Sequence, residues 1–469
     1  MRNDPLPAFD IGARLDRLPW SRTHTTIVVA LGAGWLFDSF EVQLFSSAIG
    51  PLGDHFGATS LARSGILAVW LVGILLGALF GGPLADRFGR RRLFVLTLLG
   101  YAGFTVLTGL SPTLWLVYLL RLLAALGVGA EYAVINAAVA ELIPARVRGR
   151  ANAVVMNFWP AGAVAAGLLA YLVLDTLALS SASSWRVLFI LGGLLALLVL
   201  VFRRRIPESP RWLLARGRTR EAEEILTRLE GATEVTGPQQ RISQGSGPQQ
   251  EHATPLDTRA ALGELVRRYP ARLALGAALD LAEAFGYYGI FALLAVVVLP
   301  AIHLSQAAIP VVYILGNIGG LVGGLAMSSV FDAAGRKRTV AACYLGSAVS
   351  VGLLAAATAS GSATLVTLGF ALSSALATAA WTSAYPMFTE LFPTHLRGAG
   401  VGASVAVGRI GAIVGTLLLP GIAGSIGATY SYLLVVLCWL LGLGAVVAYA
   451  LRGGVDGAGL RLEQLSPAR

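Results

Sequence analysis

Long apolar runs constrain this chain more than any other feature of its sequence. About a dozen stretches of roughly 18 or more residues carry few or no charges, and a helix of that length crosses the ~30 Å hydrocarbon core of a membrane. Lipid offers the backbone no hydrogen-bond partner, so such stretches can span it only as helices. We therefore predict an all-α membrane protein with 12 transmembrane helices. The predicted spans are residues 25–49, 62–82, 93–110, 114–142, 151–173, 185–202, 272–299, 305–330, 339–359, 363–391, 398–422 and 428–450.

The composition supports this prediction and excludes other classes. Of the 469 residues, 56% are hydrophobic and 13% are charged, too few charges to cover a soluble protein of this length. The net charge of +10 does not indicate a nucleic-acid partner, because most of the basic residues lie in the predicted loops and tails on one side of the membrane. Arg63 and Arg186 lie on one side of the membrane, Arg121 and Arg409 lie inside spans, and the other basic residues lie on the opposite side. By the positive-inside rule both termini are cytoplasmic, and the first apolar run is a retained span, not a signal peptide.

Two sequence motifs occur twice, in the same order. "GGPLADRFGRRR" (81–92) returns as "MSSVFDAAGRKR" (327–338), and "ELIPARVRG" (141–149) returns as "ELFPTHLRG" (390–398). Such a duplication predicts two six-helix bundles in parallel repeat, an arrangement typical of transporters that bind substrate between the halves. The predicted parts are a cytoplasmic tail (1–24), an N-terminal bundle (25–202), a cytoplasmic linker (203–270), a C-terminal bundle (271–450) and a second cytoplasmic tail (451–469).

The linker combines an amphipathic stretch with a polar one. Residues 206–230 predict a short amphipathic helix that starts at Pro210 and lies on the inner membrane face. The Gly-, Pro- and Gln-rich stretch 231–255 predicts a flexible linker. The arginines at 203–205 are interpreted as topology signals. The two cysteines, Cys343 and Cys438, lie in apolar spans and predict neither a disulfide nor a metal site.

These motifs resemble those of a known family. "GGPLADRFGRRR" resembles the signature loop of the major facilitator superfamily, and "RLLAALGVGAE" (121–131) resembles its fourth-helix motif. "PESPRWL" (207–213) and the two E-L-x-P-x-x-x-R-G copies resemble the branch with sugar porters, organic-ion transporters and bacterial metabolite:proton symporters related to synaptic-vesicle proteins. The resemblance covers nearly the whole chain and implies a transporter, not an enzyme.

Within that branch, details of the sequence favour organic acids over sugars. "DLAEAFGYYGIF" (280–291) lacks the Gln-Gln pair and the nearby Asn that sugar porters carry on the seventh helix, and Tyr385 stands where they carry Trp. "FDSFEVQ" (37–43) is similar to the "FDGYDLQ" of aromatic-acid:proton symporters and to the first helix of nicotinate-type transporters. "VGRIGAIVG" (407–415) resembles their eleventh-helix arginine motif. The resemblance thus implies a small organic acid as substrate.

Charged residues inside the spans need a physical reason, because each costs about 2.5–3.5 kcal/mol at the bilayer centre. Glu41 and Arg121 both lie about 12 Å below the outer surface at ~1.5 Å per residue, so we predict that they pair. By the resemblance Glu41 takes the proton-coupling position and Arg121 tunes it; a static salt bridge is the alternative. Asp38, one turn deeper, is a second proton site or a water-lined helper. Glu131 takes part in proton coupling or in the gate.

Substrate binding is predicted near the middle of the C-terminal bundle. Arg409 lies close to the midplane on span 11, and a guanidinium there can hold a carboxylate in bidentate geometry. Permanent pairing of Arg409 with Glu283 on span 7 is the alternative. Aromatic side chains at similar depths could sandwich a planar ring. The predicted substrate-binding residues are Arg409, Glu283, Trp159, Tyr287, Tyr288, Trp381 and Tyr385, with Trp35 and Phe40 as further aromatic candidates.

The repeated motifs also imply, by the resemblance, a latch that closes the cytoplasmic side. Asp86 and Asp332 are predicted near helix N-termini, where the helix dipole favours a carboxylate. The role of this latch would be conformational. Its predicted members are Asp86, Arg90, Asp332, Arg336, Glu141, Arg148, Glu390 and Arg397.

The sequence therefore predicts a proton-coupled importer of a small organic anion, such as a benzoate or a nicotinate. No nucleotide-binding loop occurs, so the energy must come from an ion gradient or from the substrate gradient. We expect no cofactor, a monomer in the lipid bilayer, and, since arginine far outnumbers lysine, a bacterial inner membrane. Three alternatives stay open: an organic-cation transporter, which the surplus of intramembrane acids would suit, a sugar:proton symporter, and a membrane sensor that binds without translocating.

Overall fold

The computed structural model describes residues 11–173, 181–204, 206–231, 258–302, 309–393 and 395–457. Within these ranges every regular element is helical. The membrane helices of the N-terminal half are α2 (Arg22–His55), α3 (Ser60–Phe88), α4 (Arg90–Gly109), α5 (Leu114–Leu142), α6 (Arg148–Met156) continued by α7 (Phe158–Tyr171), and α8 (Ser181–Arg203). Those of the C-terminal half are α12 (Pro270–Leu293), α14 (Ile309–Ala334), α15 (Arg336–Ala359), α16 (Ala363–Glu390), α17 (Arg397–Ile426) and α18 (Ala428–Leu451).

The remaining elements are short. A π-helical turn, η3 (Leu294–Val298), and α13 (Leu299–Ala301) extend α12, and the turn η1 (Ala145–Val147) precedes α6. Four further helices lie outside the two bundles: α1 (Ile11–Arg17), α9 (Pro210–Ala215), α10 (Thr219–Gly231) and α11 (Thr258–Arg268). The linker helix predicted to start at Pro210 does start there, with the Ser209 hydroxyl accepting from the Trp212 N–H, but it ends after six residues and α10 follows as a second helix.

Eleven stretches within the described residues are long and apolar enough to cross a membrane. They correspond to all the predicted spans except the seventh, residues 272–299. That position is taken by α12, which ends at Leu293 where the π-helical turn η3 begins and which carries the buried acids Asp280 and Glu283. The twelve-helix prediction is thus consistent with the structure. The predicted span that is missing from the eleven stretches is the one that carries two buried acids.

Two breaks in the helices follow from the local sequence. The fifth span divides at Asn157 into α6 and α7, because Pro160 has no N–H to donate to the carbonyl four residues earlier. Between α3 and α4 the chain reverses at Gly89 with φ +98°, and between α14 and α15 at Gly335 with φ +82°. Backbone in this region strongly favours glycine, which explains why both copies of the repeated motif carry glycine there.

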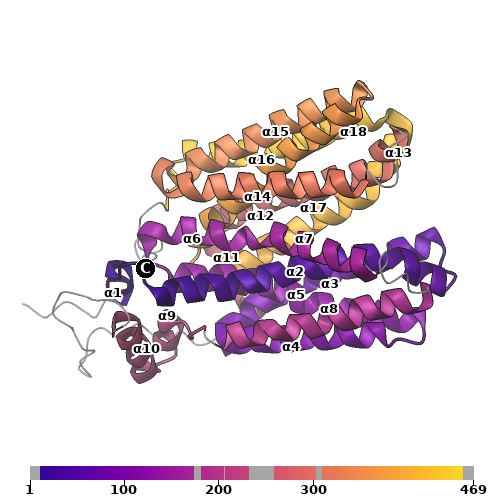
Figure 1. Ribbon diagram of the computed structural model, residues 1–469. Coiled ribbons are helices and arrows are strands. Elements are labelled where there is room, and N and C mark those ends of the chain that lie inside the picture. The colour runs from indigo at the N-terminus through magenta and orange to yellow at the C-terminus, as the bar shows by residue number, and fades with distance from the viewer. Residues whose placement is uncertain are drawn as a thin grey trace, which may run out of the picture.

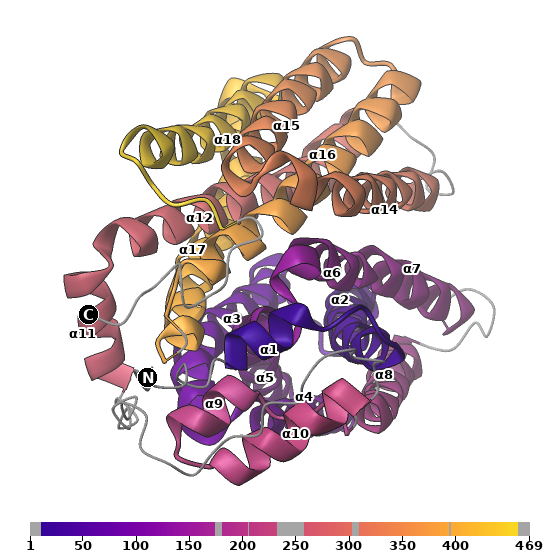
Figure 2. The ribbon, with the colours of Figure 1, turned by 90° about the vertical axis from the view of Figure 1, so that its left-hand side faces the viewer.

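The helices form two bundles that meet along two seams (Figure 1, Figure 2). In one seam α3 packs on α17, and in the other α6 and α7 pack on α14. The first seam requires backbones to touch, since a Cβ atom on Gly82 would overlap the Gly398 carbonyl. Small residues allow such close approach between membrane helices.

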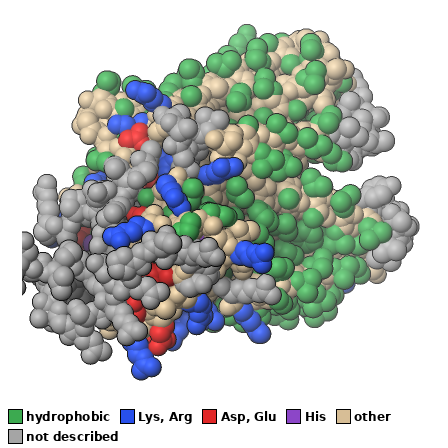
Figure 3. All heavy atoms as spheres, turned by 60° about the vertical axis from the view of Figure 1, so that its left-hand side comes forward, with side chains coloured by type: hydrophobic (Ala, Val, Ile, Leu, Met, Phe, Trp, Pro, Cys, Tyr) green, Lys and Arg blue, Asp and Glu red, His purple; other side chains and the backbone are tan. Residues whose placement is uncertain are grey.

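One end of the molecule, which we call the basic end, carries α1, α9 and α10 (Figure 1). Lys and Arg side chains gather toward this end, while much of the same face beyond it is apolar (Figure 3). Both ends of the described chain lie here, because Asp16 accepts from the Ala145 N–H at 2.8 Å and Asp456 accepts from the Arg336 N–H at 3.0 Å. The assignment of this end to the cytoplasm stays a prediction.

Candidate functional site

The predicted pair of Glu41 and Arg121 forms between α2 and α5. Arg121 Nη1 lies 3.0 Å from Glu41 Oε1, and both side chains are buried. The Thr105 hydroxyl of α4 donates a short hydrogen bond to the same carboxylate oxygen. The pairing predicted from the depths of the two residues is confirmed, whereas its role in proton coupling stays a prediction.

Aromatic rings surround the rest of the Arg121 guanidinium. Its central carbon lies 4.3 Å from the ring centroid of Trp70, 5.1 Å from that of Phe45 and 5.2 Å from that of Phe189. Cation–π contacts stabilise a guanidinium but do not neutralise it. Glu41 is therefore the counter-ion, and its loss would leave a buried charge uncompensated.

A second cluster of charged residues in the N-terminal half consists of Asp38, Glu131 and Arg203. Glu131 of α5 makes an ion pair with Arg203, the last residue of α8, and Arg203 also donates to the Phe94 carbonyl at 2.7 Å. Asp38 interacts electrostatically with the same arginine. Arg203 is almost fully buried, so its interpretation as a topology signal was wrong. Sequence reasoning missed it because it opens a run of three arginines at a span end.

Arg409 lies buried on α17 and contacts both halves. It donates to the Tyr288 hydroxyl at 3.2 Å, and its guanidinium lies 5.1 Å from the ring centroid of Tyr132, a residue of α5 in the other half. Its nearest acid is Asp280, with Nη2 4.0 Å from Oδ2. Pairing with Glu283, the alternative left open by the sequence, is not the contact that forms.

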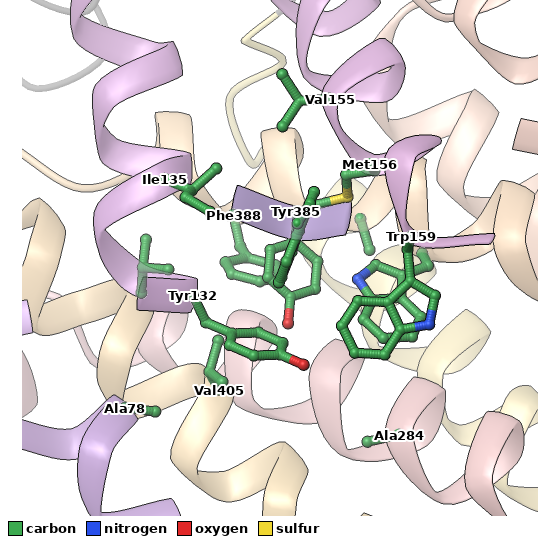
Figure 4. Close-up of a cluster of buried hydrophobic side chains, with 14 of the residues drawn as sticks. Ala78, Tyr132, Ile135, Val155, Met156, Trp159, Ala284, Tyr385, Phe388 and Val405 are labelled. Atoms are coloured by element: carbon green, nitrogen blue, oxygen red, sulfur yellow. The ribbon is translucent and has the colours of Figure 1, made fainter. Parts of the chain in front are cut away.

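The pocket between the halves is lined by aromatic side chains. Trp35, Met156 and Trp159 come from the N-terminal half, and Tyr287, Thr378, Trp381 and Thr382 come from the C-terminal half. The cavity that they line has a volume of about 10 Å³, room for about one water molecule. The rings of Trp159 and Trp381 meet across the halves with centroids 5.5 Å apart. Figure 4 shows the side chains of Tyr132 and Trp159 converging on the same region as Tyr385 of the opposite half.

Three of the predicted substrate-binding aromatic residues, Trp159, Tyr287 and Trp381, therefore line this pocket, and so does the further candidate Trp35. Tyr385 lies behind it, stacked on Trp381 at 6.2 Å, and Tyr288 lies against Arg409. The further candidate Phe40 lines a different small cavity, beside Glu41 inside the N-terminal half.

The indole nitrogens of Trp35 and Trp381 are buried and make no hydrogen bond to any residue that the structure describes. A buried donor without an acceptor is destabilising by about 1–3 kcal/mol. Two such donors in a pocket suit a ligand that brings its own acceptor oxygens or ring nitrogen. The pocket thus combines flat apolar walls with polar positions that fix orientation.

Tyr132 is the central residue that sequence reasoning missed. Its ring lies 4.5 Å from that of Trp35 and 5.1 Å from the Arg409 guanidinium, so it separates the arginine from the pocket. Nothing in its local sequence distinguishes it among the 13 tyrosines. Its importance arises from the rotation of α5, which turns it toward the other half.

The gating residues of the N-terminal half meet at the basic end. Glu141 Oε1 lies 3.0 Å from Arg90 Nη2 of its own half and 3.1 Å from Arg397 Nη1 of the other half. Asp86 lies 2.8 Å from Arg90 and accepts from the Ala399 N–H at 3.2 Å, near the N-terminus of α17. These contacts hold α3, α5 and α17 together.

The C-terminal half repeats the arrangement. Glu390 Oε1 lies 3.1 Å from Arg336 of its own half and 3.8 Å from Arg148 of the other half. Asp332 lies in α14, but its side chain is outside the described part of the structure. Glu141 and Glu390 therefore each contact one arginine of their own half and one arginine of the other half. These contacts close the basic end, and we call them the latch.

Relatives with named substrates match most of the chain. It is 29% identical over 415 residues to the niacin transporter NiaP of Acinetobacter baylyi, covering 88% of this chain and 90% of that protein. It is 25% identical to the 4-hydroxybenzoate transporter PcaK of the same organism, covering 87% of each. It is 29% identical to a probable 4-methylmuconolactone transporter of Cupriavidus pinatubonensis, covering 84% of each.

Solved structures share the fold. The proton:xylose symporter XylE bound to 6-bromo-6-deoxy-D-glucose superposes with a TM-score of 0.77 at 19% identity, over 94% of this chain and 98% of that one. The human organic anion transporter MFSD10 superposes with a TM-score of 0.64 at 16% identity, over 90% and 99%. The family model described as "Sugar (and other) transporter" matches residues 32–451. The chain therefore belongs to the sugar (and other) transporter family of the major facilitator superfamily and is a multi-pass membrane transporter, not an enzyme.

Proposed function

We propose that this transporter takes up a small organic anion, an aromatic or heteroaromatic carboxylate, together with protons. The observation that carries the proposal is the pocket of Trp35, Trp159, Tyr287 and Trp381 between the halves, with the Arg409 guanidinium one aromatic layer away. Flat rings bind a planar ring by stacking, and a buried cation favours a carboxylate. The named substrates of NiaP and PcaK, niacin and 4-hydroxybenzoate, are consistent with this chemistry.

Arg409 is the proposed carboxylate anchor, although it does not line the pocket in this conformation. Tyr132 and Tyr288 lie on its guanidinium at 5.1 and 5.5 Å from their ring centroids. In the proposal, rotation of these rings opens the path from pocket to guanidinium. Asp280, at 4.0 Å, is the acid that the substrate carboxylate must compete with.

Proton coupling is proposed to use the ion pair of Glu41 and Arg121. In the structure the guanidinium lies at 3.0 Å and serves as the counter-ion of the carboxylate. When the halves rock and the arginine withdraws, a buried carboxylate without a counter-ion takes up a proton, because an unpaired charge in an apolar interior is far more costly than a neutral acid. Asp38 and Glu131 would pass that proton toward the basic end.

Alternating access follows from the latch. Its arginines and glutamates cross between the halves, so opening the basic end must break both crossings, and closing it must remake them. We propose that the basic end faces the cytoplasm of a bacterial cell, that substrate enters from the opposite end, and that the protein works as a monomer.

The test is uptake into proteoliposomes that contain the full-length protein. The probes are labelled nicotinate, benzoate, nicotinamide, tetraethylammonium and xylose, each with and without an inward pH gradient. We expect nicotinate or benzoate to accumulate only with the gradient and to be released by a protonophore. Accumulation of the cation or of xylose instead would support the organic-cation or sugar alternative, and binding without movement would support a sensor.

A variant links the uptake to the site. Arg409→Gln should raise the KM for the transported acid about 10- to 100-fold, since a hydrogen bond to a charged group contributes about 1.5–3 kcal/mol. Arg220→Gln is the matched control, because the Arg220 side chain is 92% exposed on α10. An unchanged KM in Arg409→Gln would remove Arg409 from the substrate site.

A further inference from the structure

The first membrane helix of each half carries the same pair of acids at the same spacing. In α2 these are Asp38 and Glu41, and in α12 they are Asp280 and Glu283. All four side chains are buried. Residues three apart lie on one face of a helix, so each half directs two carboxylates toward the same region of its own bundle.

Away from the latch, each half contains one buried acid more than its buried arginines can pair. In the N-terminal half, Arg121 pairs with Glu41 and Arg203 pairs with Glu131, which leaves Asp38. In the C-terminal half, Arg409 is the arginine beside both Asp280 and Glu283. Burying a carboxylate without its own counter-ion is strongly destabilising, whereas the protonated acid avoids most of that cost.

The surroundings of Glu283 suit a proton better than a cation. Neither of its oxygens accepts a hydrogen bond from a described residue, and Tyr344 of α15, beside it, donates instead to the Leu279 carbonyl at 3.0 Å. The helices packed around the pair bring four charged or titratable groups near it: Arg409 of α17, Tyr385 of α16, Tyr344 of α15 and Tyr132 of α5. The fifth neighbouring helix, α18, contributes Trp439, which does not titrate and lies near Gly286.

We propose that Asp280 and Glu283 form a second proton-binding site, in the C-terminal half, with the proton on Glu283 and the ionised Asp280 held against Arg409. The site is the counterpart of the acid pair of Asp38 and Glu41. Two like charges that share one guanidinium titrate as a unit, so the pair and Arg409 together hold one proton in the resting protein.

This site couples to the substrate if Arg409 binds a carboxylate, a step that rests on the proposed function. An anion that takes Arg409 from Asp280 leaves both acids without a counter-ion, so Asp280 then binds a proton as well. Substrate binding and proton binding thereby favour each other in the same half, independently of Glu41.

The test needs no substrate. Infrared spectra of the purified full-length protein in lipid, recorded at pH 7, report protonated carboxylic acids through their carbonyl stretch, which lies apart from the amide bands. Glu283→Gln and Asp280→Asn should each remove the proton of the C-terminal half and lower this band by about half. Arg409→Gln should raise the band, because both acids must then be protonated. Glu221→Gln, at an exposed acid of α10, should leave it unchanged.

The outcomes separate the proton site from the proposed substrate. A band that stays constant in Glu283→Gln, or that fails to rise in Arg409→Gln, overturns the site. Misfolding cannot imitate the expected pattern, because exposed acids ionise at pH 7 and a misfolded Arg409→Gln would lower the band. If the band behaves as expected while no organic acid is transported, the site stands and the proposed substrate falls.

Discussion

Removing the charge of Glu141 should open the basic end. Glu141 Oε1 forms ion pairs with Arg90 at 3.0 Å and, across the halves, with Arg397 at 3.1 Å. All three side chains are buried. Glu141→Gln keeps the shape of the side chain but removes the carboxylate charge between the two guanidiniums, while Arg90 keeps Asp86 at 2.8 Å. In the closed state Arg397 therefore loses its contact with this charge, whereas in the open state water can solvate it.

The size of the effect follows from the contact that is lost. A hydrogen bond between charged groups contributes about 1.5–3 kcal/mol, and only the Arg397 contact crosses the halves. The Arg90 contact lies within one half and survives opening, so it does not bias the equilibrium to first order. Since about 1.4 kcal/mol is a factor of ten, Glu141→Gln should shift the ratio of open to closed basic ends about 10- to 100-fold toward open.

Spin labels at the exposed, repeat-related positions Arg92 and Arg338 can measure this shift by double electron–electron resonance. Cys343 and Cys438 carry free thiols and are replaced by alanine first. Glu141→Gln should move the distance distribution to longer values, while Glu221→Gln, which removes an exposed acid paired within α10's own segment, should not. A distribution for Glu141→Gln that matches the wild type would refute the assignment of Glu141 to the latch.

Three further perturbations test other parts of the structure. Glu41→Gln should abolish accumulation of the transported acid against its gradient and keep exchange of labelled for unlabelled acid, as measured in proteoliposomes; retained accumulation would contradict its role in coupling. Gly82→Leu should prevent closure of the basic end, because a side chain there would overlap the Gly398 carbonyl, and the same spin-label pair should report longer distances. Burial lowers the pKa of His395, in the loop before α17, despite Glu264 at 3.8 Å. Its charged form is therefore disfavoured in the folded protein, so stability should hold above its ordinary pKa of about 6.5 and fall as the pH drops below it. His395→Gln should flatten this dependence of the melting temperature on pH between 7 and 5.

Local patterns in the sequence were enough to predict the scaffold. Hydropathy placed the spans, since each helix satisfies its own backbone and must be apolar wherever it meets lipid. The repeated motifs predicted the two bundles, and the latch residues Glu141, Arg397, Glu390 and Arg148 are brought together across the halves. The pairing of Glu41 with Arg121 followed from depth alone, because in a membrane the depth of a residue is nearly fixed by its distance from the span end.

What depth could not decide is which side chains at one level face each other. Glu283 and Asp280 both lie on α12 near the depth of Arg409, and only the rotation of α12 against α17 makes Asp280 the nearer acid. Rotation of α5 likewise turns Tyr132 toward Arg409.

The sequence by itself determined the number, order and depth of the helices, because those depend on interactions within each helix and with lipid. Only the tertiary structure decided that Arg203 reaches inward to Glu131 and that Trp35, Trp159, Tyr287 and Trp381 enclose one pocket. Such contacts depend on the crossing angles and rotations of packed helices, which are set by many small side-chain fits across the interface and leave no local signal in the sequence.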